Sequence, residues 1–296
     1  MSMDVYTLRM PFRSTEEPED GSVPDGVSRP NRNVPSLLDL IRLSPEPVLP
    51  PGGEALYRQI ALFTELEAGR EVLDAACGRG LTTAFLAANH GIHGIGLDTD
   101  PALVEEASQR ARAMGLSDRL SYESAALDDR PFQDGVFDVS IGEIGLGASA
   151  NPASVVQELA RVTKPLGMVV LVQLVWSGNV DEERRELLVE HLGARPLMLV
   201  EWKQCLRDAG CVDLHVEDWS EAASPFRPAA TGPFALPGIF SFRQKLVILR
   251  RAIARWGWRG VRGALSREEE IHNLLASQRV LGLSLIVGTK WHADGG

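Results

Sequence analysis

Two carboxylates stand beside small residues at the ends of apolar runs, an arrangement typical of ligand-binding turns. Residues 71–80 read Glu-Val-Leu-Asp-Ala-Ala-Cys-Gly-Arg-Gly, so an apolar strand ends at Asp74 and continues into a turn of small residues. Gly78 and Gly80 in this turn allow the backbone to approach a ligand closely. Asp98 comes twenty-four residues after Asp74, at the end of the next apolar run. A carboxylate there can accept hydrogen bonds from both hydroxyls of a ribose, so the two motifs predict a nucleoside-binding site.

The glycine spacing favours a nucleoside over a nicotinamide dinucleotide. The dinucleotide fingerprint GxGxxG needs three glycines, whereas residues 76–81 read Ala-Cys-Gly-Arg-Gly-Leu. Asp98 alone is equally well explained as a turn residue. However, Asp100 already serves as the N-cap before Pro101 and leaves Asp98 free. Together with the first motif, Asp98 is interpreted as a ligand-binding residue.

A third carboxylate, Glu143, follows the apolar run that begins at Phe137 and is expected to face the same cavity. There it acts either as a general base or as a group that only orients a substrate. Tyr57 lies on the helix before the first motif, where it either covers the site or packs in the core. Glu268 and His272 have the i, i+4 spacing of a metal pair, but the glutamates around them suit a helix N-terminus. We therefore predict no metal site.

Strand and helix patterns alternate along the chain from residue 53 onwards, which is typical of α/β folds. Apolar runs predict strands at 71–76, 93–98, 120–125, 137–144, 167–176, 212–219 and 281–290. Helical spacing predicts helices at 37–41, 53–67, 80–90, 101–114, 151–163, 181–192, 198–209, 241–256 and 267–278. These elements predict a Rossmann-like, doubly wound, mostly parallel sheet of seven strands, with helices on both faces and a helical insertion before the last strand.

Composition divides the chain into four parts: an N-terminal arm with a short helix (1–52), a ligand-binding core (53–220), a helical lid or acceptor insertion (221–280), and the final core strand with a tail (281–296). The insertion is far longer than the ~12–15 residues beyond which a loop carries function or disorder, and its helical spacing argues against disorder. It is therefore expected to close the substrate site.

Charge and composition narrow the class of protein. The chain has 296 residues, of which 44% are hydrophobic and 24% charged, which is ordinary for a globular protein. Its three cysteines form no CxxC pair, and no apolar run reaches the ~18 residues of a membrane span. The N-terminus lacks a secretory pattern, so we expect a cytoplasmic protein. Residues 221–290 carry a net charge of +7 and the remainder −17, which disfavours nucleic acid as a partner.

Residues 241–262 have the pattern of a basic amphipathic helix. Arginines occupy many of its positions, and apolar residues recur at steps of three or four: Phe242, Leu246, Leu249, Ile253 and Trp256. Such a helix either contacts an anionic membrane surface or packs as a lid, with its arginines facing the acidic remainder of the chain. We favour the lid and keep a weak membrane-surface contact as the alternative.

The motifs resemble those of the class I S-adenosylmethionine-dependent methyltransferases, especially the small-molecule branch with quinone, tocopherol and sterol methyltransferases. Residues 72–80 look like the family's first motif and 96–98 like its second. Residues 130–139 and 158–167 are similar to the segments before its fourth and fifth strands. The resemblance extends over residues 53–220 and the last strand.

The resemblance implies S-adenosyl-L-methionine as the cofactor and Glu143 as the catalytic candidate. It assigns cofactor binding to the two motifs and neighbouring strand ends: Tyr57, Asp74, Ala76, Gly78, Gly80, Asp98, Thr99, Ala126, Leu127 and Gly142. The chain departs from the family at Ala76, where many members have Gly. It also departs at Ala126, where an Asp often binds adenine, so adenine is expected to meet the Leu127 backbone or Asp128.

The implied activity is methyl transfer to a small, apolar or amphiphilic acceptor, in which the protein mainly aligns acceptor and methyl group. Neither the methylated atom (O, N, C or S) nor the oligomeric state is legible in the sequence. Two alternatives stay open. One is a methyltransferase of a membrane-associated lipid or quinone, and the other is a cofactor-binding partner protein without catalysis.

Overall fold

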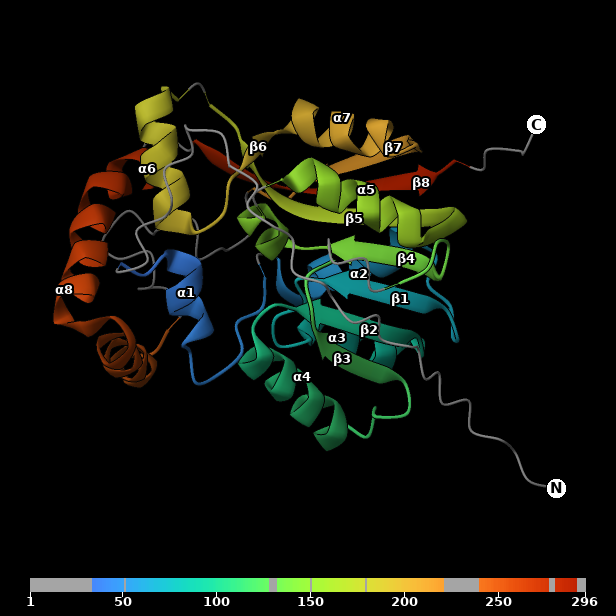
Figure 1. The fold of residues 1–296 in the computed structure, drawn as a ribbon, viewed down its shortest axis with the longest axis horizontal. Coiled ribbons are helices and arrows are strands. Elements are labelled where there is room, and N and C mark those ends of the chain that lie inside the picture. The colour runs from blue at the N-terminus through green and yellow to red at the C-terminus, as the bar shows by residue number, and fades with distance from the viewer. Residues whose placement is uncertain are drawn as a thin grey trace, which may run out of the picture. The chain divides into compact units, whose positions relative to one another are not determined.

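A sheet with helices on both faces forms the centre of the computed structural model (Figure 1). The structure describes residues 34–50, 52–127, 132–149, 151–178, 180–220, 240–276 and 280–291, and in the last helix it describes side chains as far as Ser266. The strands are β1 (Glu71–Ala75), β2 (His93–Asp98), β3 (Leu120–Ser124), β4 (Phe137–Gly142), β5 (Thr163–Trp176), β6 (Leu197–Met198), β7 (Cys211–Asp218) and β8 (Leu281–Lys290). The helices are α1 (Leu37–Arg42), α2 (Gly53–Phe63), α3 (Leu81–His90), α4 (Pro101–Ala113), α5 (Pro152–Val162), α6 (Glu182–Leu192), α7 (Leu199–Asp208) and α8 (Phe242–Ala276).

The strand order confirms the predicted doubly wound sheet. Seven strands run in the order β3-β2-β1-β4-β5-β8-β7, and β1 to β5 are mutually parallel. Only β8, among these paired strands, runs antiparallel to its two neighbours, β5 and β7. The two-residue strand β6, which the sequence did not predict, adds to β5 off this path. The strand order reverses beside β1, and such a switch point opens a crevice at the carboxyl ends of the strands.

Alternating side chains along the strands build an apolar core on each face of the sheet. Val72 of β1 packs in one cluster, with residues of α2 and α3, whereas Leu73 packs in the other, with residues of α5 and α7. Successive residues of a strand point to opposite faces, so these clusters lie on opposite sides of the sheet. The arrangement accounts for the continuous apolar runs in the sequence, because strands covered on both faces need apolar residues at every position.

Helix starts lie where the capping residues predict them. The Asp100 carboxylate accepts a hydrogen bond from the Ala102 amide at 2.9 Å, and Pro101 takes the first helical position of α4. Asn151 caps α5 in the same way, by accepting from the amide of Ser154. Both caps satisfy amides that the first helical turn would otherwise leave without a partner.

The predicted helix 53–67 is too long, since α2 ends at Phe63. The Thr64 hydroxyl donates to the Ile60 carbonyl at 2.7 Å, and Glu65 then takes a left-handed backbone with φ 47°. Leu66 fits the helical spacing because it is buried, but it reaches the core from this turn. Apolar spacing alone did not distinguish a buried turn from a further turn of helix.

The two helices predicted at 241–256 and 267–278 are joined more closely than expected in α8. Gly257 alone breaks the helix, with φ 69° and ψ 170°, and helical structure resumes at once instead of after a ten-residue gap. Glycine tolerates this left-handed φ at little steric cost. The predicted apolar packing face is also wrong, because Phe242 is 83% exposed and Leu246 is 50% exposed. Ile248 and Ala252, on a neighbouring line of the helix, are buried instead.

Three helices gather beyond the carboxyl ends of the parallel strands. Figure 1 shows α1, α6 and α8 together on this side of the sheet, and α1 is in contact with both of the others. Their position matters for function, since the ligand crevice of an open α/β sheet opens at the same ends. No described helix is both long enough and apolar enough to span a bilayer.

Candidate active site

A pocket opens at the carboxyl ends of β1, β2 and β4, where the sequence motifs converge. Its volume of about 160 Å³ far exceeds the ~10–15 Å³ that one water molecule needs on the same measure, so it has room for part of a ligand. Five residues predicted from the sequence line it: Tyr57, Ala76, Gly78, Asp98 and Glu143. The structure thus brings together the ends of three strands and a helix that are distant in the sequence.

Other predicted binding residues, Asp74 and Gly80 among them, do not line this pocket. Thr99 is exposed, Ala126 is half-buried, and the Leu127 side chain packs in the core beside α5. Gly142 is buried at the end of β4. Asp128, the alternative partner for adenine, lies outside the described residues. The described residues expected to bind the adenine base, Ala126 and Leu127, are therefore not among those that line this pocket.

The turn after β1 is held by a hydrogen bond across two strand ends. The Gly78 amide donates to Asp98 Oδ2 at 2.9 Å, and the Asp100 amide donates to Oδ1 at 2.9 Å. Gly78 has φ 53°, and a Cβ built on it would meet no atom within 4 Å. This open left-handed glycine agrees with a turn that a ligand approaches. Ala76 has φ 63°, so at this position an L-residue takes a conformation that glycine adopts at lower cost.

The other glycine of the turn, Gly80, makes room for a side chain of the protein. A Cβ on Gly80 would lie 2.5 Å from the Tyr122 ring, and a Cβ on Gly96 would meet the same ring at 2.5 Å. The Tyr122 hydroxyl shares a 2.8 Å hydrogen bond with the hydroxyl of Thr83 at the start of α3. Tyr122 therefore supports the turn from behind, which the sequence analysis missed. An aromatic residue on a short strand gives no signal for such a role.

Asp74 is a fully buried carboxylate with no hydrogen-bond partner for either oxygen. Burial raises its pKa well above the usual value, and the negative charges of Glu143 and Asp98 raise it further. Among the described residues, no Lys, Arg or His forms an ion pair with any of these three carboxylates. An uncompensated group of acids at a pocket favours a ligand that brings positive charge and hydrogen-bond donors.

Glu143 is held at the pocket by its backbone and its side chain. The buried Gln173 amide donates to the carbonyls of Gly142 and Glu143 at 2.9 and 2.7 Å, which fixes the end of β4. The Thr82 hydroxyl donates to Glu143 Oε1. Burial raises the pKa of Glu143, and the bond from Thr82 only partly offsets that rise. Its raised pKa and its place at the pocket make Glu143 a candidate proton acceptor.

Tyr57 takes both of the roles that the sequence left open, because it packs in the core and lines the pocket. Its side chain is 1% exposed and its ring lies 5.4 Å from the Phe85 ring. Burial raises the pKa of its hydroxyl, and the Glu143 charge adds to that effect, so Tyr57 stays protonated. Cys77, also on the pocket, has a free thiol whose pKa burial raises, which keeps it a poor nucleophile.

The outer wall of the pocket comes from the N-terminal segment, which the sequence analysis did not foresee. Leu38, Ile41 and Arg42 of α1 line it, followed by Val48, Leu49 and Pro50. We call residues 43–50 the strap. Ser36 and Asp39 form a capping box that starts α1, a signal present in the sequence. The prolines of the strap indicated only where α1 ends. An irregular segment has no hydrophobic periodicity, so its sequence does not show which part of the protein it packs against.

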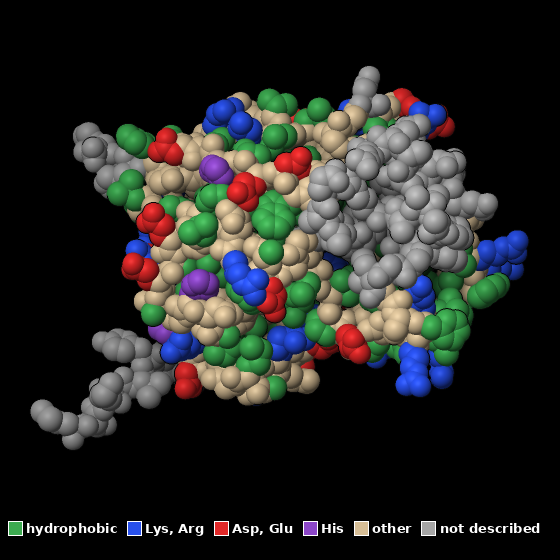
Figure 2. Space-filling view, turned by 180° about the vertical axis from the view of Figure 1, so that it is seen from behind, with side chains coloured by type: hydrophobic (Ala, Val, Ile, Leu, Met, Phe, Trp, Pro, Cys, Tyr) green, Lys and Arg blue, Asp and Glu red, His purple; other side chains and the backbone are tan. Residues whose placement is uncertain are grey.

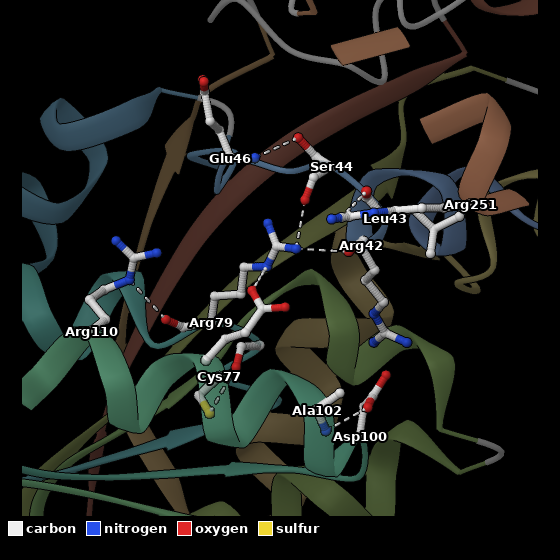
Figure 3. Close-up of polar contacts among 12 residues, drawn as sticks. Arg42, Leu43, Ser44, Glu46, Cys77, Arg79, Asp100, Ala102, Arg110 and Arg251 are labelled. Atoms are coloured by element: carbon white, nitrogen blue, oxygen red, sulfur yellow. Dashed lines mark hydrogen bonds and ion pairs between the residues drawn. The ribbon is translucent and has the colours of Figure 1, made fainter. Parts of the chain in front are cut away.

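Arg79, within the glycine turn, ties the strap to the pocket floor. One guanidinium nitrogen donates to the carbonyls of Arg42 at 3.0 Å and Ser44 at 2.7 Å, as Figure 3 shows. Nε of Arg79 lies 2.8 Å from a carboxylate oxygen of Glu106 on α4. On the outer side, Arg251 of α8 donates to the Leu43 carbonyl at 2.9 Å. Two arginines from distant parts of the chain thus hold one short segment between them.

As far as its described part shows, the predicted lid meets the pocket through the strap and through α1, which contacts α8. α8 contributes none of the pocket-lining residues, but Gln244 donates to the Glu46 carboxylate at 2.6 Å beside the Arg251 contact. Phe240 is buried, while residues 221–239 of the predicted insertion lie outside the described residues.

The described residues that line the pocket include no histidine. His191 is buried on α6 and does not line it, while the side chains of Glu268 and His272 lie outside the described residues. Within the described part of the chain, no group of three or more potential ligands is arranged to hold a metal ion.

Comparisons with known proteins agree with this geometry. Residues 72–167 match the family model described as a methyltransferase domain. The chain is 28% identical over 196 residues to methyltransferase GfsG of Streptomyces halstedii, covering 62% of this chain and 66% of that protein. It is 26% identical over 208 residues to a probable tocopherol O-methyltransferase of Oryza sativa, covering 66% of this chain and 54% of that one. The chain thus spans less than two thirds of these relatives.

Solved structures share the fold over a longer stretch. The [4+2]-cyclase SpnF superposes with a TM-score of 0.64 at 22% identity, covering 81% of this chain and 82% of that chain. A geranyl diphosphate methyltransferase in complex with S-adenosylmethionine gives a TM-score of 0.57 at 18% identity, covering 80% and 85%. These matches extend the likeness in fold beyond the family model.

Replacing Arg79 by Lys is expected to loosen the strap. A single ammonium cannot reproduce the planar guanidinium contacts with two carbonyls and Glu106. Charge-assisted hydrogen bonds contribute about 1.5–3 kcal/mol each, so amide hydrogen exchange in a peptide covering residues 37–50 should accelerate about ten- to hundredfold. Arg112→Lys, at an exposed pair with Glu105, is the matched control and should leave that peptide unchanged. Equal exchange in both variants and the wild type would contradict the role of Arg79.

Asp74→Asn is expected to stabilise the fold at neutral pH. The raised pKa means that the folded state holds this proton more tightly than the unfolded state. The wild type therefore loses stability as pH rises from the ordinary value of 3.8 towards the raised pKa. The stability advantage of the variant should grow over this range and then level off, as measured by urea unfolding at several pH values.

Asp138→Asn is the matched control with the opposite sign. Although burial works against it, hydrogen bonds from the Glu71 amide and Lys164 lower the pKa of Asp138. This carboxylate adds stability above the unfolded pKa and loses it as pH falls, so its variant should be less stable at neutral pH. The assignment of Asp74 as an uncompensated acid is wrong if the two variants respond to pH in the same direction.

Proposed function

We propose that this chain, which carries a class I S-adenosylmethionine-dependent methyltransferase domain, transfers a methyl group from S-adenosylmethionine to a small, apolar or amphiphilic acceptor. The observation that carries the proposal is the group of uncompensated carboxylates at the glycine turn, around a pocket that opens at the switch point of the sheet. The family match of residues 72–167 covers these strand ends and adds independent support.

The residues at the pocket fit this cofactor in charge and in hydrogen-bonding capacity. S-adenosylmethionine carries a sulfonium and an ammonium. The buried Asp74 carboxylate, whose oxygens have no hydrogen-bond partner, lies near Asp98 and Glu143, which line the pocket, and no described cation forms an ion pair with these three carboxylates. Asp98 already accepts one backbone amide at each oxygen and retains lone pairs that can accept ribose hydroxyls. Gly78 leaves open space on its side of the turn. We assign Asp98 to the ribose and Asp74 to the positive charge of the cofactor.

When bound, the cofactor supplies an electrophilic methyl carbon on its sulfonium. The chain then needs chiefly to align an acceptor atom with that carbon and to exclude water, and orientation alone supplies up to ~7–11 kcal/mol of barrier reduction. Tyr57 and the strap enclose the pocket on two sides. Leu38, Ile41, Val48 and Leu49 make the outer wall apolar, which favours an acceptor with an apolar body.

We assign Glu143 the proton chemistry of the reaction. It lines the pocket, it has a raised pKa, and its hydrogen bond from Thr82 holds one oxygen in place. If the acceptor atom carries a proton that must leave, Glu143 accepts it. With an acceptor that carries none, the same carboxylate orients the acceptor.

The names of similar proteins support a range of acceptors. Relatives include tocopherol O-methyltransferases and a sterol 4-C-methyltransferase of Caenorhabditis elegans, whose names indicate bulky, largely apolar acceptors and both O- and C-methylation. The similar fold of a [4+2]-cyclase indicates that this architecture also serves reactions other than methyl transfer. The test must therefore detect a methylated product as well as cofactor binding.

The proposal is tested with radiolabelled S-adenosylmethionine and a panel of phenolic, quinone, sterol and isoprenoid acceptors. Asp98→Ala should weaken binding of S-adenosylhomocysteine in calorimetry by about 1–3 kcal/mol through loss of the ribose contacts. Glu143→Gln should retain that binding but lower kcat by ~10²-fold or more with an acceptor that loses a proton. The wild-type rate should rise with pH through the raised pKa of Glu143, and the variant should lack this rise.

Two outcomes would contradict parts of the proposal. Unchanged affinity in a folded Asp98→Ala variant excludes the ribose assignment. Tight cofactor binding without product from any acceptor class favours a partner protein without methyl transfer.

A further inference from the structure

The first half of α8 presents apolar side chains to solvent on a strongly basic helix. Residues 242–262 contain seven Lys or Arg and no Asp or Glu, in a chain whose net charge is −10. On this helix Phe242 is 83% exposed, Leu246 is 50% exposed and Leu249 is 36% exposed. Their spacing of four and three residues puts all three on one face. Trp258, just after the break at Gly257, is 58% exposed.

The helix is anchored to the protein along a different line. Ile248 and Ala252 are buried, as are Val261 and Ala264 in the second half of α8. The apolar face defined by Phe242, Leu246 and Leu249 therefore stays exposed to solvent although α8 packs against the protein. In Figure 2, which views the molecule from behind, hydrophobic and basic side chains lie side by side at the edge of the molecule that α8 occupies.

The arginines around this face have no described acidic partners. No ion pair joins Arg243, Arg250, Arg255, Arg259 or Arg262 to another described residue. Arg255 instead stacks over the Trp256 ring at 5.0 Å. Within the described part of the chain, these arginines therefore form none of the ion pairs with acidic residues that a lid packed through this face would require.

We propose that residues 242–262 form a docking surface for an anionic lipid membrane. A helix with exposed aromatic and aliphatic residues beside arginines lies in the interface of a bilayer, with its apolar side chains inserted and its cations at the head groups. Charge alone would also suit a nucleic acid. However, a phosphate backbone gains nothing from Phe242 or Leu246, whose exposure costs free energy until an apolar phase covers them.

Docking through this surface places a membrane beside the outer wall of the pocket. Gln244 and Arg251 belong to the same helix and hold the strap through Glu46 and the Leu43 carbonyl. A lipid-dissolved molecule would therefore meet the protein next to the segment that covers the pocket. The docking itself rests on the helix alone and does not depend on the proposed methyl transfer.

Vesicle sedimentation with the full chain tests the proposal. The wild type should sediment with vesicles of equal parts phosphatidylcholine and phosphatidylglycerol, remain in solution with phosphatidylcholine alone, and dissociate as salt is raised. Replacing Arg243 and Arg250 together by Gln should weaken partitioning by about fivefold for each charge removed. Replacing Phe242 and Leu246 together by Ala should weaken it roughly tenfold or more.

Matched controls separate docking from general damage. Leu62→Ala with Val200→Ala removes apolar groups that are 66% and 64% exposed on α2 and α7, and it should bind as the wild type does. Arg207→Gln on α7, also exposed, is the control for charge. Because all these side chains are exposed, the variants should keep the wild-type unfolding midpoint, which confirms that each one folds.

Two results would overturn the proposal. One is equal partitioning into neutral and anionic vesicles, or equal losses in the α8 variants and the controls. The other is absence of binding to the anionic vesicles. If the chain then forms a concentration-dependent dimer that the α8 variants abolish in analytical ultracentrifugation, the face is assigned to a second copy of the chain.

Discussion

The position of Asp74 constrains the whole site. It lies on β1, the strand between β2 and β4, and its register partners are Gly96 on one side and Ile141 on the other. A central strand paired on both edges cannot shift to expose one side chain without breaking both ladders. The carboxylate therefore stays fully buried without a hydrogen bond, a state that costs stability in a low-dielectric interior. Such an arrangement is understandable where a ligand supplies the missing partner, because local strain and unsatisfied groups collect at functional sites.

Around this fixed charge, the protein builds its two pocket walls by different means. The inner wall is local in sequence, since the glycine turn follows directly from β1. Even so, it needs support from Asp98 at the end of β2 and from Tyr122 on β3. The outer wall is remote in sequence, because the strap comes from the N-terminal side of the domain and is held by Arg79 and Arg251. Removing one of these arginines removes support from the strap without touching the carboxylates that the strap covers.

The sequence predicted the parts of the molecule that depend on local rules. Apolar runs located seven of the eight described strands, and Asp100 located the start of α4, because a capped helix and a buried strand each follow from neighbouring residues. It also located Asp98 and Glu143 at the pocket, since parallel strands end on one side of a sheet. Tyr122 and the strap were missed. Their roles arise from contacts across the fold that no periodicity reports.

The predicted length of α2 and the predicted packing face of α8 were wrong for a similar reason. Leu66 satisfies the spacing of α2 although it is buried from a left-handed turn, and Phe242 satisfies an apolar stripe that packing leaves exposed. Hydrophobic spacing reports that a residue avoids water in some state of the protein. It does not report whether the core, a ligand or a membrane provides the cover.

Acidic and basic residues gather in different parts of this protein. Asp98 and Glu143 line the pocket near the buried Asp74, whereas residues 242–262 of α8 carry seven Lys or Arg and no Asp or Glu. If the arginines of α8 existed to neutralise the acids, they would lie in ion pairs, yet their nearest described polar contact with the site is Arg251 on a backbone carbonyl. That bond uses the guanidinium as a donor towards the strap and leaves the carboxylates of the pocket uncompensated. We infer that the two charge systems serve different partners, one inside the pocket and one outside the molecule. The strap and α1 both line the pocket and contact α8.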